Sequence, residues 1–248
     1  MIYQMFLFCI ILSGLSLPQK KAMNEQFYNS WLRSEYFDEI KRGETPLECM
    51  KMEYVMQLYF FKGTDSVLIG SFNEGIIKEY SVESFDSLIV CDPNDLGKPK
   101  FIISICNENG LMLIIDDGYK KIKFRVLEKK YYRRNGVDLF INDHFFTGDY
   151  ESAQDSTLKV SFSRQGKIEE LNNVDRYKIT LFAVDVPKIE TVTFYLGHKF
   201  HKTFHWQKSG ENIILYNLSN EDNSWPGPNS VISGKYLELV KRNSKGQF

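Results

Sequence analysis

The chain has 248 residues, of which 43% are hydrophobic and 25% charged, and these values are ordinary for a globular protein. Its 31 basic and 32 acidic residues leave a net charge of −1, so the charge balance does not indicate a nucleic acid or an anionic membrane surface as a partner. Phe and Tyr are frequent, with 19 and 14 copies, and because aromatic side chains fit half-buried sheets the composition favours β structure.

The first 17 residues, MIYQMFLFCIILSGLSL, are mostly apolar and carry no charged side chain, and the polar PQKK follows them. This pattern is typical of a secretory signal peptide, and the small residues Gly14 and Ser16 predict cleavage after Ser16. The alternative is an uncleaved anchor, although a bilayer span needs about 20 residues. We therefore expect residues 1–16 to be a signal peptide and the mature protein to be secreted, periplasmic or on the cell surface. Membrane association is expected only if this segment stays uncleaved.

Residues 24–43 are predicted to form an N-terminal helix. Their large apolar side chains recur mostly at a spacing of four, which places them on one broad helix face. These side chains are Phe27, Tyr28, Trp31, Leu32, Tyr36, Phe37 and Ile40. Asn24 is a suitable N-cap, and Gly43 followed by Thr45-Pro46 ends the pattern. We expect the apolar face to pack on the open end or flank of a β-barrel.

After Pro46 the apolar residues alternate with a period of two, which is typical of strands, and turn sequences such as DPNDLG and NENG separate the runs. The predicted strands are 52–61, 66–72, 76–82, 85–90, 100–106, 110–115 and 121–127. Short strands at this spacing predict a first β-barrel-like domain over residues 46–128.

The charged stretch that follows, which contains an Asn-Gly pair, is predicted to be a linker over residues 129–145. A second series of alternating runs comes next. Its predicted strands are 147–152, 156–163, 166–171, 175–182, 191–196, 200–206, 212–217 and 235–241. They predict a second β-barrel domain over residues 146–242. The expected fold class is therefore all-β, with two antiparallel β-barrel halves preceded by one N-terminal α-helix.

One hairpin of each series indicates a tandem repeat. DSVLIGSFNEGIIKEY (65–80) aligns with DSTLKVSFSRQGKIEEL (155–171) after a single-residue gap. The shared frame is Asp-Ser-x-Leu-x-x-Ser-Phe, followed by a turn glycine and x-Ile-x-Glu. Because hairpins also share turn residues by chance, duplication and coincidence both stay open.

The second half contains Gly148-x-Tyr150, Gly166-x-Ile168 and Tyr177-x-Ile179, followed by TVTFY, FHWQ, IILYN and YLELVK. In this spacing, residues 146–242 resemble the lipocalin-like β-barrel domains of uncharacterised secreted proteins of Bacteroidetes-type bacteria. Tyr150 stands where the Gly-x-Trp motif of typical lipocalins has Trp. The resemblance implies a β-barrel with a binding or scaffolding role, and it carries over no catalytic residue.

We predict an exported, non-catalytic protein that binds a small apolar or amphipathic ligand in a β-barrel. Such a ligand needs an interior cavity of about 300 Å³ or more. The expected ligand contacts, in the barrel interior or at its mouth, are Phe162, Tyr177, Phe194, Trp206 and Trp225. The alternative is a structural or interaction protein of the cell envelope, because side chains alone can fill barrels of about eight strands. The chain lacks the common catalytic and dinucleotide motifs, so no enzyme activity and no cofactor are expected.

The stretch GHKFHKTFHW contains three of the four histidines, His198, His201 and His205. On a helix these positions share one face and suit zinc. The stretch alternates as a strand, however, with Phe200, Phe204 and Trp206 on one face and Lys202 outside the pattern. Only His201 and His205 then share a side, roughly 13 Å apart. We therefore expect a solvated hairpin face and no metal site.

Three cysteines follow the predicted signal peptide, namely Cys49, Cys91 and Cys106. Cys91 and Cys106 each end an apolar run, so they are either a cross-strand disulfide or small core residues.

Overall fold

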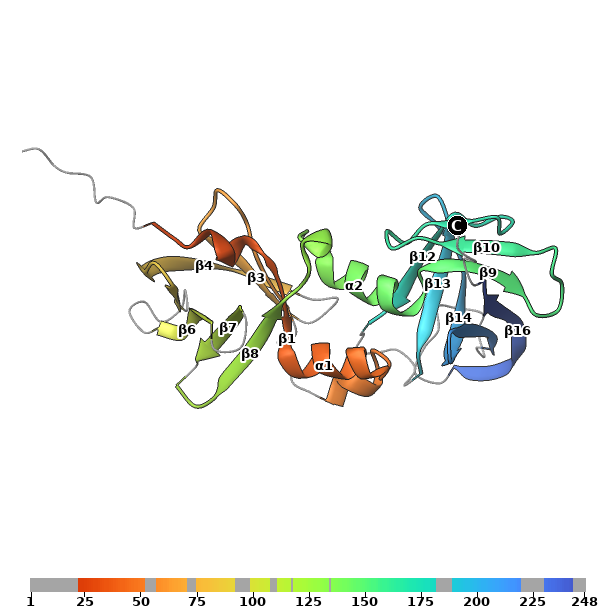
Figure 1. Ribbon diagram of the computed structural model, residues 1–248, viewed down its shortest axis with the longest axis horizontal. Helices are drawn as coiled ribbons and strands as arrows, with labels where there is room; N and C mark the ends of the chain where they lie inside the picture. Colours follow the sequence, from red (N-terminus) through yellow and green to blue (C-terminus); the bar gives the residue numbers. More distant parts are fainter. Residues whose placement is uncertain are drawn as a thin grey trace, which may run out of the picture.

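A computed structural model describes residues 22–51, 57–70, 75–91, 99–107, 111–116, 118–133, 135–181, 189–219 and 230–242. Within these ranges the chain is mostly β, and its strands form two eight-stranded antiparallel sheets (Figure 1). The predicted all-β class with two barrel-like halves is therefore confirmed. The predicted signal peptide and Trp225 lie outside the described residues.

The first sheet is a closed barrel in which each strand pairs with its neighbour in the sequence, and β1 pairs with β8 to close the ring. Its strands are β1 (Ser30–Arg33), β2 (Gln57–Phe60), β3 (Ser66–Gly70), β4 (Gly75–Ser84), β5 (Ser87–Cys91), β6 (Pro99–Cys106), β7 (Met112–Asp116) and β8 (Lys121–Val126). A short 3₁₀ turn, η1 (Glu25–Tyr28), precedes β1, and Asn24 caps it by accepting a hydrogen bond from the Gln26 N–H.

The predicted N-terminal helix is wrong in its first half. Only α1 (Ser34–Arg42) is α-helical, and it ends at Gly43 as expected. Residues Ser30–Arg33 instead form β1, which pairs with both β2 and β8. Trp31 is buried in the first-barrel core while Leu32 is buried in a second core, which is the two-sided alternation of a strand. The backbone hydrogen bonds of barrel closure outweigh the helix preference of this segment, because they pair β1 on one edge with β2 and on the other with β8.

The second sheet repeats the up-and-down order, and β9 pairs with β16. Its strands are β9 (Gly148–Ser152), β10 (Lys159–Phe162), β11 (Ile168–Glu169), β12 (Arg176–Thr180), β13 (Thr191–Leu196), β14 (Lys199–Ser209), β15 (Asn212–Ser219) and β16 (Val231–Lys241). Between β11 and β12 the described residues make a single bridge, from Lys167 to Arg176. Two backbone hydrogen bonds, from the Ile168 N–H to Asp175 and from the Tyr177 N–H to Gly166, form this bridge, and no longer ladder joins the two strands within the described residues.

The predicted linker contains two helical elements, η3 (Lys129–Tyr131) and α2 (Gly136–Phe145). Most of α2 is buried, so apolar residues surround it and no amphipathic period is visible in the sequence. A Cβ atom on Gly136 would lie 2.1 Å from the Tyr131 carbonyl oxygen, and this close approach requires glycine at the start of α2.

The two barrels are joined by a shared core. Leu32 and two residues of α1, Tyr36 and Ile40, belong to the same buried cluster as α2 and the interior of the second barrel. Both helices lie between the barrels (Figure 1). The rings of Phe37 on α1 and Phe140 on α2 are stacked 5.3 Å apart. A further 3₁₀ turn, η2 (Glu48–Lys51), follows α1.

The two aligned hairpins hold different places in the two sheets. Residues 65–80 contain β3 and most of β4, the third and fourth strands counted from the closing strand β1. Residues 155–171 contain β10 and β11, the second and third strands counted from β9. The shared strand order thus does not account for the hairpin similarity.

Candidate functional site

Four of the five predicted ligand contacts lie together inside the second barrel. Phe162, Tyr177, Phe194 and Trp206 are all buried, with at most 4% of their surface exposed. Phe146, which follows α2, packs against three of them, with ring centroids 5.2 Å from Trp206, 5.3 Å from Tyr177 and 5.5 Å from Phe162. Side chains therefore occupy the end of the barrel that faces α2.

The opposite end of this barrel is apolar and exposed. Trp206 contacts Phe145 of α2, so the earlier residues of β14 lie further from α2, together with the second half of β15 and the first half of β16. Of the ten large apolar side chains that are exposed in the described ranges, five belong to this end. We call them the apolar rim: Leu196, Phe200, Val231, Ile232 and Tyr236.

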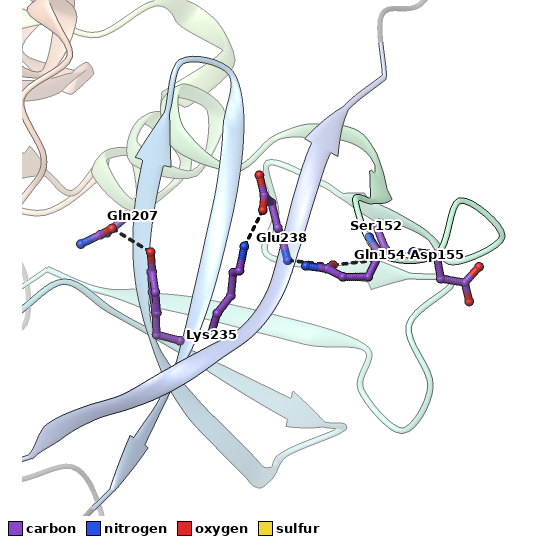
Figure 2. Close-up of polar contacts among 7 residues, drawn as sticks. Ser152, Gln154, Asp155, Gln207, Lys235 and Glu238 are labelled. Carbon is purple, nitrogen blue, oxygen red and sulfur yellow. Dashed lines mark hydrogen bonds and ion pairs between the residues drawn. The ribbon is translucent and has the colours of Figure 1, made fainter.

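The apolar rim includes the part of β16 that precedes its pairing with β9, a pairing that we call the seam. That pairing covers Leu239 to Lys241, and the Ala153 N–H donates to the Glu238 carbonyl just before it. Figure 2 shows this point, where Gln154 Oε1 accepts hydrogen bonds from the Ser152 hydroxyl and the Glu238 backbone N–H. On the outer surface Lys235 donates to Glu238 at 2.8 Å (Figure 2). The rim residues of β16 all come before this seam.

One cation points into the barrel at the rim end. Lys202 pairs with the buried Phe194, and directly opposed residues of antiparallel strands share a face. Its ammonium lies 5.2 Å from the ring centroid of Phe204 and 5.4 Å from that of Tyr236. It also donates to Asn217 Oδ1 at 2.8 Å. The Lys202 ammonium thus lies beside these two rings, which stack on each other with centroids 4.6 Å apart.

The alternation expected for β14 is wrong in its first half. The register of β13 and β14 shifts between Phe194 and Tyr195, which changes the face on which the earlier residues of β14 lie. Phe200 is therefore exposed, although a place on the apolar face was predicted for it. Lys202, which did not fit the pattern, points inward. The mismatch of Lys202 was the sequence signal for this site.

His205 does not lie on a solvated face, contrary to the prediction. It is buried, its Nδ1 hydrogen-bonds to the Glu190 carbonyl at 2.8 Å, and burial lowers the pKa of its ring. His201 is exposed. Among the described residues, no group of three or more His, Cys, Asp or Glu side chains is placed to hold a metal ion.

Glu190 connects the two halves through its buried carboxylate. Glu190 Oε1 accepts a hydrogen bond of 2.6 Å from the backbone N–H of Leu47, which lies between α1 and η2. Burial raises the pKa of Glu190 to about 7, and hydrogen bonds from Thr45 and Leu47 oppose part of that effect. A titratable group therefore lies at the junction of the barrels.

A small cavity of about 180 Å³ lies between α2, the turn after β10 and β12. Asp138 and Asn142 of α2 line one side, and Tyr177, Lys178 and Ile179 of β12 line the other. Of the four predicted ligand contacts that the structure describes, Tyr177 borders this cavity. The cavity is smaller than the predicted interior space and lies at the flank of the barrel. Asp138 was missed because its segment was expected to be a linker.

Cys49 and Cys106 carry free thiols, so the alternative of a disulfide between Cys91 and Cys106 is not realised. Cys49 is buried, and burial raises the pKa of its thiol well above its ordinary value. A thiol of this kind is inert, because the thiolate is the reactive form.

Comparison of the chain with protein-family models, with curated proteins and with solved structures finds no match. Neither α1 nor α2, nor any other helix within the described ranges, has the length and apolar character needed to cross a membrane. The function is therefore inferred from the geometry of the molecule.

Proposed function

We propose that this chain is an exported, non-catalytic binding protein whose lipocalin-like second barrel takes an amphipathic ligand with an anionic head group. The ligand enters at the end that carries the apolar rim. The observation that carries this proposal is the half-buried Lys202 ammonium, which lies on the inner face of β14 beside the stacked rings of Phe204 and Tyr236.

The Lys202 charge lacks a counter-ion from the protein. No ion pair joins it to an acidic side chain in the described part of the chain, and one of its three N–H groups is used by Asn217. A charge that is partly withdrawn from water is costly unless it is paired, and contact with the rings compensates by about 0.5–1 kcal/mol. A carboxylate, sulfate or phosphate head group would add charge-assisted hydrogen bonds, each worth about 1.5–3 kcal/mol.

The apolar rim supplies a surface for the tail of the ligand. Exposed apolar residues that gather in one place mark interaction or ligand-binding sites more often than scattered ones do. Because Phe146 and its neighbours fill the end next to α2, the ligand lies near the rim and does not penetrate the full depth of the barrel.

Calorimetric titration of the full chain with sodium dodecanoate tests this proposal. The variant is Lys202→Met, and the matched control is Lys235→Met, which removes a lysine of the outer surface near the rim. We expect Lys202→Met to weaken dodecanoate binding about tenfold or more, the equivalent of one charge-assisted hydrogen bond, and Lys235→Met to leave it unchanged. Dodecanol, which lacks the charge, should not distinguish the variants. Equal effects of the two substitutions on dodecanoate, or no binding to the unmodified chain, would contradict the proposal.

A second candidate function is that of a structural or interaction protein of the cell envelope. The aromatic packing around Phe146 and the core shared by α1, α2 and the second barrel favour it. Native mass spectrometry of the mature protein, secreted from a bacterial host, separates the two functions. A bound mass in the lipid range supports a ligand, and a bare chain supports an interaction role.

A further inference from the structure

We propose that the cavity between α2 and β12 is a binding site for a small zwitterion of the size of one apolar amino acid. Asp138 receives its ammonium group and Lys178 receives its carboxylate. This site is separate from the apolar rim and does not depend on the function proposed for it.

The cavity is formed by elements that the rest of the fold holds firmly. The α2 side is fixed because α2 is buried in the shared core. On the barrel side, the turn after β10 lies close against β12, since a Cβ atom on Gly166 would be 2.7 Å from the Tyr177 carbonyl oxygen. A site built on such elements is preorganised, which reduces the entropy lost on binding.

Asp138 brings a carboxylate without a direct hydrogen-bond or ion-pair partner among the described residues to this cavity. The side chain is half-buried, and burial raises the pKa of Asp138 while the charge of Lys178 lowers it. Within the described residues, no hydrogen bond or ion pair reaches its carboxylate. A carboxylate in such surroundings binds a cationic group readily, because the ligand replaces the lost hydration with a charge-assisted hydrogen bond.

Lys178 places the opposite charge on the same cavity. It lines the wall with Asp138, yet the two form no ion pair within 4.0 Å in the structure. A ligand that carries both charges can therefore bridge them. Asn142 donates its amide N–H to the Arg164 carbonyl at 3.1 Å, which leaves Asn142 Oδ1 as an acceptor for the ligand ammonium.

The size and walls of the cavity restrict the ligand further. A volume of about 180 Å³ equals the share of about six water molecules in the liquid. A whole lipid, nucleotide or oligosaccharide is larger than this volume. Leu139, Ile179 and Leu181 give the cavity an apolar wall that suits a short aliphatic side chain. These features together match a free amino acid such as alanine, valine or leucine.

Titration of the full chain with L-alanine, L-valine and L-leucine, followed by the amide resonances in NMR spectra, tests the proposal. Isopentylamine and 4-methylpentanoate serve as probes that each lack one charge of leucine. The variants are Asp138→Asn and Lys178→Met. Their controls are Glu169→Gln and Lys167→Met, which change exposed residues on or next to β11.

We expect saturable shifts in α2 and β12 with at least one amino acid, and weaker binding of both single-charge probes. Each cavity variant should lower the affinity about tenfold or more, while the controls should leave it unchanged. Asp138→Asn should fold, because it removes a charge from a half-buried position; its melting temperature checks this. The proposal is wrong if none of the three amino acids binds, or if Asp138→Asn binds as the unmodified chain does. Lys202→Met should keep amino-acid binding, which separates this site from the rim.

Discussion

Replacing Glu190 with Gln should remove a large part of the pH dependence of stability. Glu190 is 8% exposed, and its pKa in the folded chain is about 7, against an ordinary value of 4.5. Because the folded pKa is raised, the group stabilises the fold fully below about pH 4.5, and this contribution is lost as the pH rises to about 7. Above that pH the loss is constant.

The interval from 4.5 to 7 corresponds to about 3 kcal/mol of folding free energy, since each pH unit is worth about 1.4 kcal/mol. Gln keeps the shape of the side chain and an acceptor for the Leu47 N–H, but it does not ionise. The stability of Glu190→Gln relative to the unmodified chain should therefore rise by about 3 kcal/mol between pH 4.5 and pH 7.5.

Urea unfolding at pH 4.5 and pH 7.5, monitored by tryptophan fluorescence, measures this difference. Glu169→Gln is the control, because that side chain is exposed. Burial lowers the pKa of His205, so its contribution has the opposite sign and is lost as the pH falls below about 6.5. It is present in both proteins and cancels in the comparison. A difference between Glu190→Gln and the unmodified chain that is equal at the two pH values would refute the reasoning.

Two further substitutions test the packing. Phe146→Ala should lower the free energy of unfolding by about 3–5 kcal/mol in urea titrations, because it leaves a cavity in the ring cluster at the α2 end of the second barrel. A loss below about 1 kcal/mol would mean that side chains do not fill this end as described. Gly136→Ala should destabilise by about 1–3 kcal/mol despite the better helix propensity of Ala, because its Cβ would lie 2.1 Å from the Tyr131 carbonyl oxygen. An unchanged or raised melting temperature for that variant would contradict the close approach.

The strands could be predicted because the sequence pattern of a strand involves only neighbouring residues. Every range expected to be a strand contains one, since period-two alternation and turn residues are visible within a few neighbours. Two elements depend on distant partners and were missed. Residues 30–33 become β1 only when β8 closes the ring, and α2 is apolar on most sides because it is buried between the two barrels.

The candidate sites were harder to predict from the sequence. Four interior aromatic residues were placed correctly on the basis of strand parity, but parity alone does not show that Phe146 packs among them. The bulge lies on β14 itself, between Phe200 and Lys202, so Phe200 changes face while Lys202 keeps the parity of Phe204 and Trp206; strict alternation along a strand does not reveal such an extra residue. Asp138 becomes a site residue only because α2 packs beside β12, which depends on the tertiary structure.

The core shared by the two halves has a consequence for biosynthesis. The first barrel can close once β8 has been made, because its own interior is complete at that point. Tyr36 and Ile40 of α1, however, belong to a cluster that is complete only when α2 and the second barrel follow. A nascent chain paused between β8 and β9 therefore presents a folded barrel with an exposed apolar face on α1. Chaperones should recognise that intermediate, and truncation after the first barrel should yield an aggregation-prone product.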